Sequence, residues 1–129
     1  MLQLNKVHHI AIICSDYQKS KTFYTTVLGL SIIQEIYRAE RQSYKLDLAL
    51  NGEYVIELFS FPNPPIRPSK PEAVGMRHLA FEVNDIQKTR DYLIHQNITA
   101  EIIRVDEFTQ KNFFFIADPD ELPIEFYEK

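Results

Sequence analysis

The chain has 129 residues, of which 45% are hydrophobic and 25% charged, as in an ordinary soluble globular protein. Its net charge of −4 argues against a nucleic acid or an anionic membrane as partner. The apolar run from Ile10 to Cys14 is too short for a signal peptide or a membrane span. Cys14 is the only cysteine and cannot form an internal disulfide, so we predict a cytoplasmic protein in which this residue is a buried, small apolar side chain.

The first half of the chain, about 4–60, is predicted to form strand, helix and three strands in that order. Asp16 is a suitable N-cap for the helix, and Gly29 ends it. Asn51-Gly52 is a strong signal for a two-residue hairpin. The predicted elements are a strand over 7–14, a helix from Tyr17 to Leu28, and strands over 30–38, 43–50 and 53–60.

The segment 61–75 contains five prolines and is predicted to link this module to a second one at about 76–128. The second module repeats the order of the first, with Asn97 as the helix C-cap. Neither half is long enough to bury its sheet alone, so we predict a single α+β domain, 1–129, or packing on a partner chain. The predicted elements are a strand over 76–83, a helix from Asp85 to Gln96, strands over 98–105, 112–117 and 122–127, and a turn at Asp118-Pro119-Asp120.

Two pairs of segments repeat between the halves. The segment His9-Ile-Ala-Ile-Ile-Cys-Ser-Asp corresponds to His78-Leu-Ala-Phe-Glu-Val-Asn-Asp, and Tyr-Val-Ile-Glu57-Leu-Phe corresponds to Leu-Pro-Ile-Glu125-Phe-Tyr. Each half therefore supplies one His early in a strand and one Glu in a late strand. Two His and two Glu at corresponding positions are a typical ligand set for a metal ion.

Strand alternation tests whether these four side chains can converge. His9 shares its face with Ala11, and His78 shares its face with Ala80. These small neighbours leave room for an ion and a ligand. The intervening residues are large and apolar and should pack on the helix, so all four candidate ligands are predicted to face away from the helix layer.

An isolated His in a strand is more often a hydrogen-bonded structural residue than a ligand, and His8 and His95 are assigned to that class. The matched positions of the two His–Glu pairs favour a metal site, because two carboxylates buried close together need a compensating cation. Two imidazoles and two carboxylates suit one Ni²⁺, Co²⁺, Mn²⁺, Fe²⁺ or Zn²⁺ ion and leave coordination positions open. Open positions favour a catalytic site over a structural one.

The doubled module with its two His–Glu pairs resembles the vicinal oxygen chelate superfamily, and within it the small bacterial glyoxalase I (lactoylglutathione lyase) proteins. The resemblance covers almost the whole chain and implies tandem βαβββ modules that form curved mixed sheets, in a homodimer whose site lies within one chain or between two. It rests on His9-x-Ala-Ile, the helix start Asp16-x-x-x-Ser20 with Phe23-Tyr24 and Leu28-Gly29, Arg77-His78-Leu-Ala, and Asp118-Pro-Asp ahead of Ile124-Glu125.

The resemblance also implies roles for individual residues. His9, Glu57, His78 and Glu125 correspond to the metal ligands; Glu125 corresponds to the base that moves a proton, a role that Glu57 can share. The implied activity is that of a metal-dependent lyase or isomerase acting on a small 2-oxoaldehyde thiol adduct or a similar α-hydroxycarbonyl compound. The alternatives are another activity of the superfamily, such as an epimerase or a dioxygenase, and a non-catalytic module that sequesters a small molecule, similar to bleomycin-resistance proteins.

Three positions depart from the glyoxalase I pattern. Ile13 and Phe61 stand where that family carries an Arg and an Asn, and an apolar side chain cannot pair with a glutathione carboxylate. Glu121 stands where the turn usually has Gly, which affects the turn geometry. Several basic residues are candidates for binding an anionic substrate, but most are expected to be solvated: Arg38, Arg41, Lys45, Arg77, Arg104 and Lys111. Tyr44 and Asp47 are expected on opposite strand faces, with no joint role.

Overall fold

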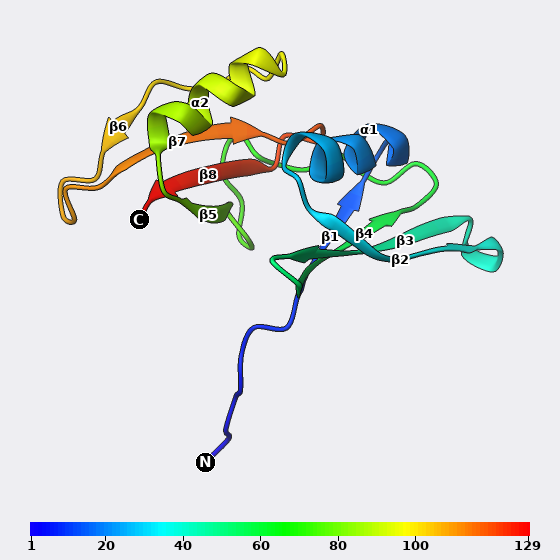
Figure 1. Ribbon diagram of the computed structural model, residues 1–129. Helices are drawn as coiled ribbons and strands as arrows, with labels where there is room; N and C mark the ends of the chain where they lie inside the picture. Colours follow the sequence, from blue (N-terminus) through cyan, green and yellow to red (C-terminus); the bar gives the residue numbers. More distant parts are fainter. The chain divides into compact units, whose positions relative to one another are not determined.

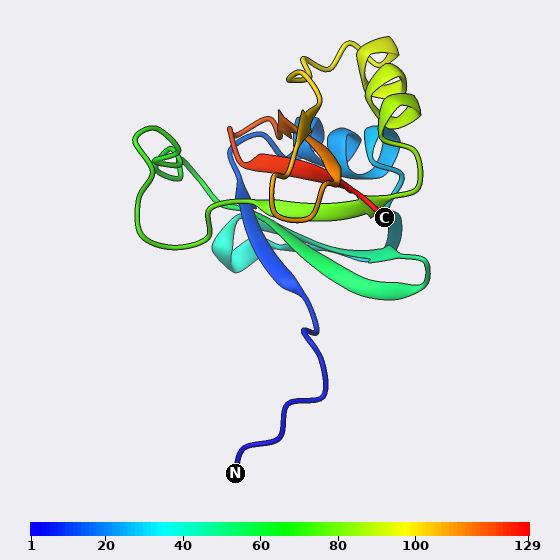
Figure 2. The ribbon, with the colours of Figure 1, turned by 90° about the vertical axis from the view of Figure 1, so that its left-hand side faces the viewer.

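Each half of the sequence folds into its own four-stranded mixed sheet with a helix on one face. The computed structural model describes all residues, 1–129. The chain forms two compact units, Met1–Pro65 and Ile66–Lys129. Figures 1 and 2 show the helical segment of each unit lying over one side of the sheet of that unit. The predicted α+β class and the doubled strand-helix-strand-strand-strand order are confirmed.

In the first unit the strand order is β1-β4-β3-β2, with β1 parallel to β4 and the other pairs antiparallel. Apolar residues alternate along these strands, so that Leu46 and Leu48 of β3 and Ile56 and Leu58 of β4 are almost fully buried on one face. Cys14 joins this core, as predicted. The elements are β1 (Ile10–Cys14), α1 (Tyr17–Thr22), a π-helical segment (Phe23–Val27), β2 (Ser31–Arg38), a short 3₁₀ helix (Ala39–Arg41), β3 (Ser43–Leu50) and β4 (Glu53–Ser60).

The second unit repeats this topology with the strand order β5-β8-β7-β6. Strand β5 is parallel to β8, and Phe114, Ile116, Ile124 and Phe126 form the buried face of the sheet with Leu93 of the helix. The elements are β5 (Leu79–Val83), α2 (Ile86–His95), β6 (Arg104–Val105), β7 (Asn112–Ala117) and β8 (Pro123–Glu128). None of the helices is both long and apolar enough to cross a lipid bilayer.

Both helices begin where the sequence predicts. Asp16 and Asp85 accept hydrogen bonds from the backbone N–H groups three residues ahead, at 3.1 and 3.0 Å. The first helix does not stay α-helical to Leu28, because its last turn widens into a π-helix in which the Leu28 N–H donates to the Phe23 carbonyl. Gly29 follows with φ of +77°, a value that glycine adopts without strain.

Three sequence predictions differ from the structure at element boundaries. Strands β1 and β5 are shorter than predicted, so His9 and His78 each lie one residue before the strand. The predicted strand over 98–105 is reduced to the two residues of β6. Before it, the Glu101 N–H donates to the Phe115 carbonyl, so the chain approaches β7 without forming a continuous ladder.

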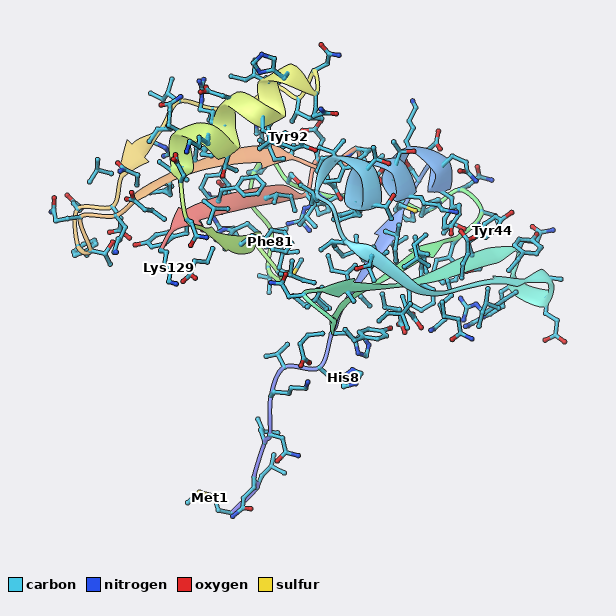
Figure 3. All side chains as sticks on the ribbon, in the orientation of Figure 1. Met1, His8, Tyr44, Phe81, Tyr92 and Lys129 are labelled. Atoms are coloured by element: carbon cyan, nitrogen blue, oxygen red, sulfur yellow. The ribbon has the colours of Figure 1, made fainter.

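The proline-rich segment 61–75 has no helix or strand, as predicted, but its second part is not a free linker. The Arg67 guanidinium donates to the carbonyls of Met76 and Arg77, and Ser69 donates to the Glu121 carbonyl at 2.7 Å. These bonds attach the segment to the second unit. At the N-terminus the first residues run away from the first sheet without regular structure (Figure 3, label Met1), whereas His8 lies beside Tyr54 of β4.

Candidate metal centre

The two His–Glu pairs occupy the same position in their respective sheets. In the first unit Glu57 is the cross-strand partner of Ala11, two residues after His9. In the second unit Glu125 is the partner of Ala80, two residues after His78. The exposed fractions match as well: 35% and 16% for the His9 and Glu57 side chains, 31% and 14% for His78 and Glu125. The repeated sequence therefore builds two equivalent half-buried pairs on parallel strands.

Each pair turns the imidazole Nε2 toward the carboxylate. His9 Nε2 lies 3.9 Å from Glu57 Oε1, and His78 Nε2 lies 3.0 Å from Glu125 Oε2. Imidazole nitrogen and carboxylate oxygen, with no thiolate, are donors that suit a divalent transition metal. Neither unit gathers three or more His, Cys, Asp or Glu side chains that could hold a metal ion. Each unit brings together one imidazole and one carboxylate of the predicted set.

In the first unit the carboxylate of Glu57 is held by a polar network. The Tyr54 hydroxyl shares its single proton between Asp47, at 2.7 Å, and Glu57, at 3.1 Å. Lys45 places its ammonium 2.7 and 2.8 Å from the two oxygens of Asp47 and 3.4 Å from Glu57. Both oxygens of the Asp47 carboxylate are therefore neutralised, and one oxygen of Glu57 is fixed.

The network shifts the ionisation of its members. The hydrogen bond to Asp47 raises the pKa of the Lys45 ammonium above its ordinary value. Burial acts to raise the pKa of Asp47, but the hydrogen bonds from Lys45 and Tyr54 outweigh it, and the pKa is lowered overall. Burial, followed by the bonds to the two carboxylates, raises the pKa of the Tyr54 phenol. At neutral pH the network consists of a protonated Lys, an ionised Asp and a neutral Tyr.

In the second unit the surroundings of the pair are aromatic. Phe115 is the cross-strand partner of Glu125, the position that Asp47 holds relative to Glu57. Its ring lies edge-on to the His78 imidazole at 5.1 Å between centroids. The His78 imidazole is the only polar side-chain partner of Glu125, and His78 Nδ1 is buried with no hydrogen-bond partner.

Sequence reasoning missed Tyr54 and misjudged Lys45. Tyr54 has no counterpart in the second unit, where Leu122 occupies the corresponding position of the repeat, so repeat matching passes over it. Lys45 belongs to the set of basic residues of which most are expected to be solvated, but it is tied to two carboxylates. His95 is structural as predicted, with Nδ1 bonded to the Asp91 carbonyl at 2.7 Å. The His8 ring lies 5.1 Å from the Tyr54 ring between centroids, and His8 Nδ1 lies 2.8 Å from His9 Nδ1.

Comparison with known proteins places this arrangement in a family. The model of the Glyoxalase/Bleomycin resistance protein/Dioxygenase superfamily matches residues 6–126. The chain belongs to that superfamily. It is 60% identical over 126 residues to YwkD of Bacillus subtilis (strain 168), with 98% of each chain covered. It is 59% identical over 129 residues to YaeR of Escherichia coli (strain K12), with both chains fully covered. Both relatives are described as uncharacterized proteins.

Among solved structures, the glyoxalase family protein from Enterococcus faecalis matches with a TM-score of 0.89 and 45% identity, over 95% of this chain and 97% of its own. More distant members of the superfamily share the fold only. They include a lactoylglutathione lyase from Agrobacterium tumefaciens (17% identity, TM-score 0.69). The fosfomycin resistance protein FosX from Listeria monocytogenes, with Mn(II) bound, has 13% identity and a TM-score of 0.76. Members of the superfamily commonly bind a divalent metal ion.

Proposed function

We propose that the protein is a metal-dependent lyase or isomerase of the glyoxalase I type, acting on a small α-hydroxycarbonyl compound or a thiol adduct of a 2-oxoaldehyde. The observation that carries this proposal is the equal register of the two His–Glu pairs. A repeat that needs only a stable sheet does not require a half-buried imidazole and a carboxylate at the same two positions twice. Superfamily membership and the Mn(II) bound by FosX support the same assignment.

In the proposed site His9, Glu57, His78 and Glu125 hold one divalent ion, Ni, Co, Mn, Fe or Zn. When bound, such an ion polarises a chelated carbonyl and makes the neighbouring C–H more acidic. Glu125 is proposed to carry the proton between the two carbons of the substrate, because it lacks the Tyr and Lys partners that hold Glu57. Glu57 is proposed mainly to bind the ion. It shares the proton-transfer role when the substrate lies on the Glu57 side of the ion.

The deciding experiment is elemental analysis of the purified protein beside the His9→Ala and His78→Ala variants. We expect about one divalent ion per site, lost in both variants, followed by turnover of methylglyoxal with one of several thiols. Oxygen consumption during turnover would instead indicate a dioxygenase. No bound metal, and no uptake when each ion is supplied, would shift the function to sequestration of a small molecule.

The protein is further proposed to act as a cytoplasmic homodimer, and mixing the two His variants tests how the ion is shared. If each ion is held by pairs from two chains, a mixed dimer of His9→Ala and His78→Ala contains one site with both His residues intact. Each mixed dimer then binds metal at half the wild-type stoichiometry, and a randomly re-associated 1:1 mixture, in which about half of the dimers are mixed, at about a quarter. If both pairs of one chain hold the ion, the mixture stays empty. Size-exclusion chromatography with light scattering checks that a dimer forms.

A further inference from the structure

Arg38 at the end of β2 lies over two aromatic rings of the first unit. Its guanidinium carbon is 4.8 Å from the centroid of the Phe59 ring and 5.8 Å from that of Phe61. The two rings stack on each other with 5.9 Å between centroids. A guanidinium that stacks on rings keeps its N–H edge in a fixed direction, which suits recognition of a planar or tetrahedral oxyanion.

The charge of Arg38 has no counterion within the chain. One Nη donates to the Ser43 hydroxyl at 2.8 Å, Nε is buried without a partner, and no carboxylate lies within ion-pair distance. Arg104 in the second unit provides the comparison. It stacks on Phe113 and Phe115 at 4.9 and 5.7 Å but donates to the Glu101 carboxylate at 3.0 Å. A half-buried cation without a partner is costly, so an anion from outside the chain is the missing partner of Arg38.

This surface continues the face that carries the His9–Glu57 pair. Phe59 follows Glu57 by two residues on β4, about 7 Å further along the strand on the same face. Ile13 is the cross-strand partner of Phe59 and is 55% exposed. The apolar side chains of Ile13 and Phe59 therefore lie between the Glu57 carboxylate and the Arg38 guanidinium.

We infer that Arg38, Phe59, Phe61 and Ile13 form a substrate subsite for a small organic oxyanion with an apolar stem. The stem lies on the Ile13 and Phe59 side chains, and a terminal carboxylate or phosphonate-type group meets the Arg38 guanidinium. This inference rests on the proposed function, because it takes the His9–Glu57 end as the reacting end. It restricts the substrate to compounds whose anionic group is several bonds away from the chelating oxygens.

The test is calorimetric titration of metal-free protein with 3-phenylpropanoate, phenylphosphonate and the neutral 3-phenylpropan-1-ol. We expect the oxyanions to bind at least about tenfold more tightly than the alcohol, and more weakly at high salt. Arg38→Gln should weaken oxyanion binding by about tenfold or more, whereas Arg104→Gln, the stacked Arg that already has a carboxylate, should leave it unchanged. Arg38→Lys keeps the charge but not the planar stack and should fall between.

Circular dichroism and melting temperature of each Arg38 variant establish that it is folded. Binding of only one of the two oxyanions supports the subsite and identifies the anion class. The inference is overturned if neither oxyanion binds the wild-type protein at millimolar concentration, if the alcohol binds equally well, or if Arg38→Gln binds like the wild type. Because the titration uses metal-free protein, failure to take up metal would sink the proposed function and leave this result intact.

Discussion

The two units place a His and a Glu identically but surround them differently. Around Glu57 stand Tyr54, Lys45 and Asp47, whereas the position of Asp47 is taken by Phe115 beside Glu125. The sheet scaffold accounts for what is shared, because the register of the parallel strands sets where each pair lies. The difference comes from the neighbouring antiparallel strand, which supplies Lys45 and Asp47, and from Tyr54 on the strand of Glu57 itself. The Glu57 carboxylate is held in place by hydrogen bonds, whereas Glu125 has the aromatic residue Phe115 as its cross-strand partner.

This contrast assigns different tasks to two similar residues. A carboxylate that accepts bonds from a phenol and an ammonium is restrained in its position. A carboxylate with one imidazole partner retains freedom to rotate. The structure thereby supports the division of labour proposed above, in which Glu57 binds and Glu125 transfers.

Removing either carboxylate should have the largest effect. Glu57→Gln and Glu125→Gln keep the size of the side chain but lose the negative charge, so each should lower the affinity for a divalent ion by about 100-fold or more. Competition with a chromophoric chelator measures this affinity. If one variant alone loses affinity, a single unit holds the ion; unchanged occupancy in both would sink the ligand assignment.

Substitution of Asp47, in the polar network of the first unit, should lower the free energy of unfolding more than substitution of Phe115, at the equivalent position of the second unit. Asp47 is buried and accepts hydrogen bonds from Lys45 and Tyr54, so Asp47→Asn should cost about 2 kcal/mol of unfolding free energy. Phe115→Leu, at the equivalent position, should cost about 1 kcal/mol because it removes only part of an apolar side chain. Urea unfolding followed by circular dichroism gives both values. A larger loss for Phe115→Leu would mean that Lys45 and Tyr54 add little to stability.

The hydroxyl of Tyr54 should tune the affinity for metal through Glu57. Tyr54→Phe removes one bond to Glu57 and one to Asp47 while leaving the ring in place. Loss of such an outer contact should weaken metal binding by about tenfold, less than loss of Glu57 itself. The matched control is Tyr92→Phe on α2, a phenol on the helix of the other unit. Equal affinities of Tyr54→Phe and the wild type would show that Glu57 is oriented without the network.

How much of this the sequence can predict depends on strand register. The doubled topology, both N-caps and the pairing of each His with its Glu follow from alternation and repeat matching. The Asp47–Glu57 contact does not. Counting back from the Asn51-Gly52 hairpin pairs Asp47 with Ile56, on the wrong face, whereas a bulge between Leu48 and Ala49 shifts the register by one residue. A one-residue shift turns every later side chain to the opposite face, and nothing in the local sequence marks it.

The smallest predicted effect concerns how each helix is tied to its sheet. In the first unit Lys21 and Tyr17 donate to the Glu35 carboxylate and lower its pKa, with Lys21 the larger cause. In the second unit Arg90 donates to the Glu101 carbonyl, a group that does not titrate. A carboxylate with a lowered pKa stabilises the fold above its unfolded-state pKa of about 4.3, and this contribution is lost as the pH falls through the folded-state value.

Glu35→Gln should therefore lower the melting temperature by about 2 °C near pH 7, a small effect because the side chain is one-third exposed and screened by solvent. The difference from the wild type should vanish at a second, acidic pH below the folded-state pKa of Glu35, where Glu35 is protonated in both states. Arg90→Gln should cost about the same at both pH values, since its acceptor is a neutral carbonyl. Thermal melts of the wild type, Glu35→Gln and Arg90→Gln at the two pH values measure this. They distinguish the contact of the first unit, which depends on an ionised carboxylate, from that of the second unit, which does not. If Glu35→Gln still melts at a lower temperature than the wild type at low pH, the packing of the Glu35 side chain, and not its charge, stabilises the contact.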